Sequence, residues 1–434
     1  MRSFISAVLL LSVLSPPICA ADTSYREAAL QAARWIRAST IQAGQGAVWP
    51  ADPRDAKSVN DTLYAGTPGV VLFFIEAYRS TGDQSFLKDA RAGADHLLEA
   101  FPSIKASGLY EGIAGVGFAL MEAFKATKDS RYRRGALRCA RLVGERARKA
   151  GNGIDWDDTT DIIAGGAGIG LFLLSAAREL NEPAFRELAI RDAYRLIELG
   201  RSEKNGLKWA MNPTFARLMP NFSHGTAGIA YFLATLYQQT RKKEFLDAAL
   251  AGARYLESVA RTDGDICLIF HNEPDGKDLY YLGWCHGPVG TARLFYRLYQ
   301  VTGNREWMRW VSRAARGIMT SGIPEMQTAG FWNNVSQCCG SAGVAQFFLD
   351  LYRVTHRRDY LDFSKRVTAQ VLAKATQDQD GIRWIQAEHR VKPDLLVAQT
   401  GYMQGAAGIG MLLLHLDQLH NRKRRSIRFP DSPF

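Results

Sequence analysis

Apolar residues follow two alternating helical patterns along the chain. Residues 70–78 are apolar on almost every side, which is typical of a helix buried between two layers, whereas residues 86–98 carry one apolar stripe opposite charged positions. The turn-rich residues 80–83 join these segments and indicate antiparallel neighbours. The pattern therefore predicts a helical hairpin with an inner, fully buried helix and an outer, amphipathic helix.

This hairpin unit repeats along the whole chain. Each inner helix begins at a Gly-x-x-Gly step, and successive steps are 46 to 65 residues apart. The seven steps are Gly66/Gly69, Gly112/Gly115, Gly165/Gly168, Gly225/Gly228, Gly287/Gly290, Gly340/Gly343 and Gly405/Gly408. Glycine suits a point where loop and helix backbones approach closely. Stacking such units predicts parallel inner helices with all seven steps at one end.

The last unit contains one helix only, within residues 408–420, and residues 22–40 can supply its outer partner. A first helix that completes the last hairpin predicts a closed arrangement. We therefore expect an all-α fold, an α/α toroid in which seven helical hairpins form a double ring with parallel inner helices. An open helical array is the alternative.

The composition agrees with a large folded domain. The 434 residues are 47% hydrophobic and 22% charged, which excludes a disordered chain and a membrane protein with several spans. A positive residue at position 2, an apolar run at residues 4–14 and small residues near position 20 are typical of a secretory signal peptide. The run is shorter than the roughly 20 residues of a membrane anchor, which is the other interpretation.

These features predict three parts: a signal peptide at residues 1–21, a toroid domain at 22–421 and a basic tail at 422–434. The protein is expected to be secreted or periplasmic, with no integral membrane span after cleavage. Its formal net charge of +11 is scattered except at the run Arg422 to Arg425, which we interpret as solvated. Scattered charge does not form the continuous basic surface that nucleic acid requires, so no nucleic-acid partner is expected.

Three cysteines lie directly before Gly-x-x-Gly steps, namely Cys285, Cys338 and Cys339. Helix N-termini favour thiolates, and neighbouring inner helices of a ring can bring these side chains together. Three thiolates with an open fourth position would form a Zn²⁺ site that binds a substrate. The spacing alone also permits a bond between the neighbours Cys338 and Cys339, or ordinary buried thiols.

Further motifs surround these cysteines. They are Gly283-Trp284-Cys285-His286-Gly287, Cys338-Cys339-Gly340, Ser223-His224-Gly225, and Asp161 four residues ahead of Gly165. In this repeat context the combination resembles the LanC-type lanthionine cyclases over nearly the whole mature chain. The resemblance implies an α/α toroid, a zinc ion held by Cys285, Cys338 and Cys339, and addition of a cysteine thiol to dehydroalanine or dehydrobutyrine to form a thioether.

The resemblance also implies roles for three further residues. His224 corresponds to a histidine suited to protonate the α-carbon after sulfur addition, and Asp161 to an acidic partner that orients a histidine or polarises the site. His286 would share the acid–base work or contact a metal ligand from outside. Taken alone, His224 can cap a helix start and Asp161 can act as an N-cap. The expected partners are a dehydrated peptide or a small thiol.

Two positions depart from the bacterial members of that family. These usually carry Arg four residues before the first cysteine and Tyr directly after it, where this chain has Tyr281 and His286. The missing Arg removes a cation that could stabilise an enolate. The Trp-Cys-His-Gly sequence instead matches eukaryotic LanC-like proteins.

Two other function classes fit the sequence. One is a non-catalytic, zinc-containing module that binds peptides or thiols. The other is a carbohydrate-active enzyme, because α/α toroids also serve glycoside hydrolases and lyases, with acid and base supplied by Asp155, Asp157, Asp158 and Asp161. The first three of these aspartates can equally coat a loop.

Overall fold

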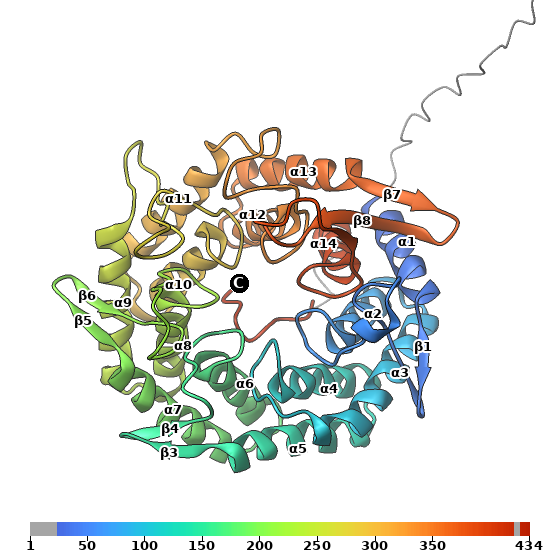
Figure 1. Ribbon diagram of the computed structural model, residues 1–434, viewed down its shortest axis with the longest axis horizontal. Coiled ribbons are helices and arrows are strands. Elements are labelled where there is room, and N and C mark those ends of the chain that lie inside the picture. Colours follow the sequence, from blue (N-terminus) through green and yellow to red (C-terminus); the bar gives the residue numbers. More distant parts are fainter. Residues whose placement is uncertain (1–23, 421–425) are drawn as a thin grey trace, which may run out of the picture.

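The two helix patterns separate into two concentric layers. In the computed structural model, which describes residues 24–420 and 426–434, helices form a double ring around a central opening (Figure 1). The inner helices are α2 (Thr67–Thr81), α4 (Ile113–Thr127), α6 (Gly166–Glu179), α8 (Thr226–Thr240), α10 (Pro288–Thr302), α12 (Ser341–Thr355) and α14 (Ala406–Asp417). The outer helices are α1 (Tyr25–Ala38), α3 (Gln84–Ala100), α5 (Ser130–Arg146), α7 (Ala184–Leu199), α9 (Lys243–Val259), α11 (Glu306–Met319) and α13 (Arg358–Ala373).

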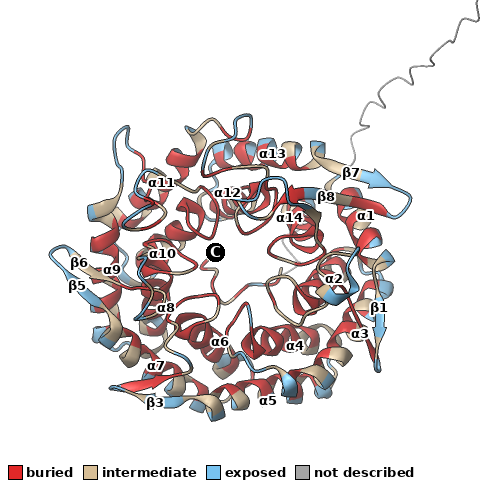
Figure 2. Cartoon of the chain, in the orientation of Figure 1, coloured by how far each residue is buried: buried red, intermediate tan, exposed pale blue. Residues whose placement is uncertain are grey.

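Burial follows the predicted pattern. The inner helices are buried along most of their length, while the outer helices bury only the side that faces the inner ring (Figure 2). Short 3₁₀ turns lie at Ala56–Ser58, Phe101–Ser103 and Gln418–His420. None of the described helices is both long and apolar enough to span a membrane.

The ring is closed, as predicted. Helix α1 packs against α14 and completes the last hairpin, and α14 in turn contacts α2 of the first. The α/α toroid is thus confirmed, and the open array is wrong. The predicted signal peptide at residues 1–21 and the run Arg422 to Arg425 lie outside the described residues.

A closed circle of backbone hydrogen bonds joins the seven units at the end that carries the Gly-x-x-Gly steps. Each unit contributes the residue two positions before its first glycine: Tyr64, Tyr110, Ile163, Ser223, Cys285, Cys338 and Met403. The N–H of each of these residues donates to the carbonyl of the corresponding residue in the next unit, at 2.8 to 3.2 Å. The exception is the third unit, where Ile162 and not Ile163 is the donor. The last bond, from Met403 to Tyr64, returns to the first unit. Every backbone in this circle therefore has a fixed neighbour on each side.

Small β-elements, which the sequence analysis missed, brace the outer ring. Three are hairpins: β1 (Ile41–Ala43) with β2 (Gly46–Val48), β3 (Arg148–Ala150) with β4 (Gly153–Asp155), and β5 (Arg201–Glu203) with β6 (Gly206–Lys208). The fourth is a three-stranded antiparallel sheet of β7 (Ala375–Asp378), β8 (Gly381–Ala387) and β9 (Leu396–Ala398). Each packs against the outer helix of the next unit.

All four elements share a Gly-x-x-Trp sequence, at Gly46/Trp49, Gly153/Trp156, Gly206/Trp209 and Gly381/Trp384. The indoles of the last three tryptophans donate to a carbonyl of the preceding outer helix at 2.7 Å. The glycine allows close approach to the following outer helix. At Gly381, φ is +122° and an added Cβ would stand 2.2 Å from the Gln31 carbonyl of α1. The last sheet thus closes the outer ring onto the first helix.

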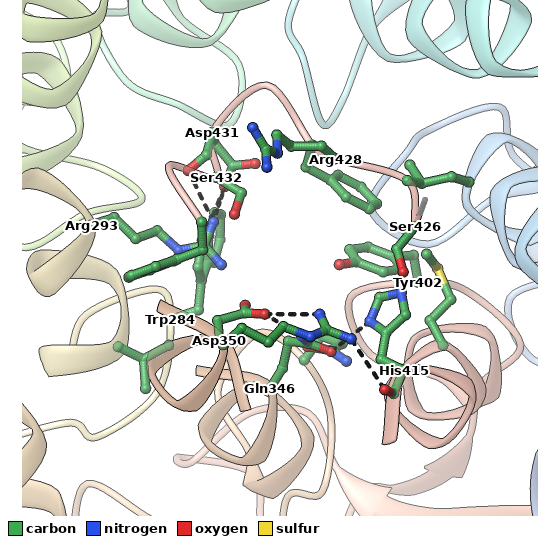
Figure 3. Close-up of a pocket in the computed structure, with 18 of the residues that line it drawn as sticks. Trp284, Arg293, Gln346, Asp350, Tyr402, His415, Ser426, Arg428, Asp431 and Ser432 are labelled. Atoms are coloured by element: carbon green, nitrogen blue, oxygen red, sulfur yellow. Dashed lines mark hydrogen bonds and ion pairs between the residues drawn. The ribbon is translucent and has the colours of Figure 1, made fainter. Parts of the chain in front are cut away.

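The C-terminal residues differ from the expected solvated tail. Residues 426–434 cross the central opening, with Asp431 fully buried (Figures 1 and 3). The Asp431 carboxylate accepts hydrogen bonds from Arg293 at 2.8 Å and from the Trp284 indole at 3.1 Å. Phe429 stacks on Tyr402 with ring centroids 4.5 Å apart. The basic run favoured a solvated tail, whereas the apolar residues Ile427 and Phe429 after it are buried inside the ring.

We expect Gly381→Ala to destabilise the protein by about 2–4 kcal/mol, because the new methyl group meets backbone atoms of α1 at a strained φ. Gly264 is a matched control, since its φ is also positive, at +72°, but no atom lies within 4 Å of the added Cβ. Gly264→Ala should cost about 1 kcal/mol. Chemical denaturation measures both free energies of unfolding. Equal losses in the two variants would contradict the role of the sheet in ring closure.

Candidate metal centre

The three predicted cysteines converge at the starts of α10 and α12. Their sulfur atoms all lie within 4.8 Å of one another, with 3.1 Å between Cys285 and Cys339 and 3.5 Å between Cys339 and Cys338. All five cysteines in the described part of the chain are free, so the alternative of a Cys338–Cys339 bond is not what the structure contains. Cys285 and Cys338 are buried, and Cys339 is partly exposed. The cluster is therefore reached from the side of Cys339.

Local backbone geometry sets this convergence. The N–H groups of Trp284 and Cys285 both donate to the Cys338 carbonyl, at 2.8 and 3.2 Å. Gly283 allows the contact, because a Cβ there would stand 2.8 Å from backbone atoms of Cys338 and Cys339. Cys285 and Cys338 are adjacent members of the backbone circle, so ring closure itself holds the two thiols side by side.

The three thiols differ in pKa. Hydrogen bonds from Cys285 and Cys339 lower the pKa of Cys338 well below its usual range. Burial raises the pKa of Cys285, and hydrogen bonds to Cys285 and Cys338 raise that of Cys339. Three adjacent thiolates repel one another, so full deprotonation of the set requires a cation among them.

The donor set fits a metal that prefers thiolate ligands. In tetrahedral thiolate sites with metal–sulfur distances of about 2.3 Å, the sulfurs stand roughly 3.8 Å apart, close to the separations found here. Sequence analysis missed one supporting residue. The Tyr64 hydroxyl hydrogen-bonds to the Cys338 sulfur and accepts from the Gln404 side chain at 2.8 Å. Such contacts from outside the ligand set orient the ligands of metal sites.

His224 and Asp161 form a second, adjacent group. His224 Nδ1 lies 2.6 Å from Asp161 Oδ2, and this carboxylate is buried. The other oxygen of Asp161 accepts from the N–H groups of Ala164 and Gly165 at 2.8 and 2.9 Å, so Asp161 holds the loop ahead of α6 and orients the histidine at once. The N-cap of α6 is Gly165 and not Asp161. Burial acts to lower the pKa of His224, but the hydrogen bond to Asp161 and its charge outweigh burial, and the pKa is raised. His224 is thus poised to carry a proton.

His286 occupies a different environment. It is buried, and its Nδ1 has no hydrogen-bond partner among the described residues. Burial, followed by the positive charges of His224 and His271, places its pKa well below the usual range. The His286 ring lies between other aromatic rings, with centroids 5.5 Å from His224, 4.4 Å from His271 and 5.6 Å from Tyr281. His286 therefore packs as a neutral ring beside the cysteines.

Two residues beside Tyr281, His271 and Arg390, were not predicted from the sequence. His271 packs against Tyr281 with ring centroids 4.5 Å apart, and burial lowers the pKa of His271. Arg390, from the segment between β8 and β9, donates through Nε to the Tyr281 hydroxyl at 3.3 Å. Neither residue lies near a Gly-x-x-Gly step in sequence, so no local motif marks them.

Most of the predicted acidic run lies apart from this group. Asp155 pairs with Arg148 at 2.7 Å and with Arg195 at 3.3 Å. Asp158 lies near the same two arginines, at 3.2 and 3.6 Å, and Asp157 accepts from the Thr159 N–H at 3.1 Å. Only Asp161 joins the candidate site. The others stabilise their loop, the alternative given for them above.

An aromatic layer separates the cysteines from the opposite side of the ring. The Trp284 ring packs against Tyr110 at 5.3 Å and against Phe222 at 5.7 Å, and all three side chains are buried. Beyond Trp284 lies a cavity of about 1260 Å³, lined by charged residues of the inner helices and by residues 426–434 (Figure 3). This cavity is therefore distinct from the thiol group.

Comparisons with known proteins agree with this arrangement. The chain matches the sequence model of the family described as "Lanthionine synthetase C-like protein" over residues 57–431. Among solved structures it resembles nisin cyclase, with a TM-score of 0.65 and 16% identity over 92% of this chain and 94% of that one.

Two further structures share the fold. They are an inactive alpha-1,6-mannanase variant from Salegentibacter sp. HEL1_6 in complex with alpha-1,6-mannotetrose (TM-score 0.51, 13% identity, 91% and 98% coverage) and the Lin0763 protein from Listeria innocua (TM-score 0.52, 14% identity, 93% and 99% coverage). At such identities the structural matches establish the fold alone.

We expect the three thiols to bind one divalent ion together. Titration with Cd²⁺ should give thiolate-to-metal charge-transfer absorption that saturates at about one ion per chain. Cys285→Ser should weaken this binding at least about tenfold, since a ligand is lost. Cys267→Ser is the matched control, because Cys267 is equally buried but lies outside the cluster. Unchanged binding in Cys285→Ser would refute the site.

Proposed function

The chain belongs to the lanthionine synthetase C-like family, and from that premise we propose that it catalyses addition of a cysteine thiol to a dehydroalanine or dehydrobutyrine residue, forming a thioether. The observation that carries this proposal is the convergence of three thiols beside a histidine held by a buried carboxylate. Thiol addition needs both parts, a place where a thiol loses its proton and a group that returns one.

In this proposal Cys285, Cys338 and Cys339 hold Zn²⁺. When bound, the ion would supply an open position at which a substrate thiol ionises near neutral pH. The chain's own residues support that role in two ways. Tyr64 and Gln404 orient the Cys338 sulfur, and the aromatic layer around Trp284 excludes water from beneath the cysteines.

His224 is the proposed proton donor to the α-carbon. Its Nδ1 is engaged with Asp161, which leaves Nε2 for proton transfer. Asp161 fixes the ring orientation and raises the pKa of His224, which favours the protonated form that donates a proton. The buried, neutral His286 fits a packing role beside the ligands better than a second acid.

The proposal also includes a substrate and a cellular location for the protein. A dehydrated peptide, or a dehydrated peptide together with a small thiol, is the proposed substrate. Secretion or export to the periplasm is proposed from the signal-like residues 1–21. The carbohydrate alternative has support from the shared fold, but Asp155 and Asp158 are each neutralised by two arginines, so the geometry supports thiol chemistry better.

We expect purified protein to contain about one Zn²⁺ per chain, and His224→Asn to retain it while losing thiol addition to a dehydroalanine peptide by about 10²–10⁴-fold. Elemental analysis and mass spectrometry of the adduct measure the two quantities. His389→Asn, on an exposed residue, is the control and should keep full activity. Equal rates in wild type, His224→Asn and an enzyme-free sample, with zinc present in both proteins, would favour the binding module.

The pH profile separates the two functions of Asp161. Asp161→Asn keeps an oxygen that can accept from the Ala164 and Gly165 N–H groups but removes the charge that raises the pKa of His224. The pKa of His224 should then fall, so the protonated form is lost at lower pH and the alkaline limb of kcat moves to lower pH. Thermal unfolding of the variant checks that the loop ahead of α6 stays intact. An alkaline limb at its original pH would exclude His224 as the titrating donor.

A further inference from the structure

Thiol addition creates negative charge away from the sulfur. As the sulfur–Cβ bond forms, the electron pair of the Cα=Cβ bond moves toward the acyl oxygen of the dehydro residue. That oxygen is stabilised by a hydrogen-bond donor already aimed at it in a partly buried site. The α-carbon then takes its proton from His224. The proposed function therefore requires an oxygen-stabilising group that is separate from the proton donor.

The hydroxyl and cationic groups near the cysteines are mostly committed to other partners. The Tyr64 hydroxyl bonds to the Cys338 sulfur and to Gln404, and His224 is bound to Asp161. Tyr281 differs from these. Its hydroxyl oxygen accepts from Arg390 Nε at 3.3 Å, and its own O–H hydrogen has no acceptor among the described residues. An accepted bond from a cation polarises a hydroxyl and strengthens the bond that it donates.

Arg390 is the cationic group that contacts the Tyr281 hydroxyl. No carboxylate in the described part of the chain lies within ion-pair distance of it, and its one hydrogen bond goes to Tyr281. The residue comes from the segment between β8 and β9, more than one hundred positions after Tyr281 in the sequence. A half-buried guanidinium without an anionic partner indicates a place where negative charge develops or binds.

Contacts with neighbouring rings fix the position of the Tyr281 phenol. Tyr281 packs against Trp332 at 5.3 Å and against His271 at 4.5 Å, which fixes its plane. Its edge meets His286 at 5.6 Å, and His286 also contacts His224 at 5.5 Å. Tyr281 and His224 thus both contact the ring that follows Cys285. An acyl oxygen and its α-carbon are two bonds apart, so they need two donors that are close but distinct.

We propose that Tyr281 donates a hydrogen bond to the acyl oxygen of the dehydro residue, and that Arg390 is a positioning residue that orients and polarises this phenol. The pair forms an oxyanion subsite for α,β-unsaturated acyl groups. Tyr281 keeps its proton throughout, since only His224 transfers one. This assignment rests on the proposed function for its chemistry, but the binding site itself can be tested without turnover.

The first test measures binding, so it needs no activity. The probes are a peptide in which a charged phosphinate replaces the acyl group of the dehydro residue, and the same peptide with alanine at that position. Wild-type protein should bind the phosphinate at least about tenfold more tightly. Tyr281→Phe and Arg390→Ala should lose this preference. Lys392→Ala, which removes an exposed cation from the same segment, should keep it.

The second test measures turnover with metal content recorded for each variant. Tyr281→Phe should lower kcat by about 10²–10³-fold while KM and bound zinc change little. Arg390→Ala should lower kcat by about tenfold, and Arg390→Lys should restore part of the loss. Because Arg390 acts through the phenol, adding Arg390→Ala to Tyr281→Phe should cause no further loss.

The outcomes separate the two proposals. No phosphinate preference in wild type, or a full kcat in Tyr281→Phe, overturns the subsite while leaving thiol addition intact. Additive losses in the double variant overturn the positioning role of Arg390. A phosphinate preference that depends on Tyr281, in a protein that never adds thiols, supports the subsite and refutes the proposed function.

Discussion

The circle of backbone hydrogen bonds is the constraint on which the site depends. Each unit offers one N–H and one carbonyl just before its inner helix, and each finds its partner in a neighbouring unit. Cys285 and Cys338 occupy adjacent places in this circle. The next residue is alanine in two units, and in the other five it is Glu111, His224, His286, Cys339 or Gln404. The structural repeat thereby places several of the site's chemical groups at equivalent positions of successive units.

Other parts of the molecule keep that circle from opening. From outside, each Gly-x-x-Trp element ties one outer helix to the next, and the sheet at Gly381 joins the last unit to the first. From inside, Asp431 bonds to Arg293 and Trp284, which lie on and just before α10. Trp284 adjoins Cys285, so the C-terminal segment supports the cysteine cluster from beneath.

Much of this could be predicted from sequence because the repeat is local. The Gly-x-x-Gly steps and the two helix patterns gave the toroid, and the incomplete last unit gave its closure. The Gly-x-x-Trp sequence also recurs along the chain, but it was not predicted to form hairpins because strands this short lack a strong apolar alternation. Tyr64, His271 and Arg390 could not be found in this way. Their positions depend on ring closure and long loops, which bring distant segments together without any local pattern.

The segment that crosses the central opening limits how a long polypeptide could use the ring. With residues 426–434 inside and the buried layer of Trp284, Tyr110 and Phe222 beneath the cysteines, a chain cannot be threaded along the axis from one face to the other. Under the proposed function, a peptide substrate would enter and leave at the face that carries the cysteines. Successive sites on one peptide would therefore be visited by release and rebinding, in an order set by the peptide and not by directional translocation.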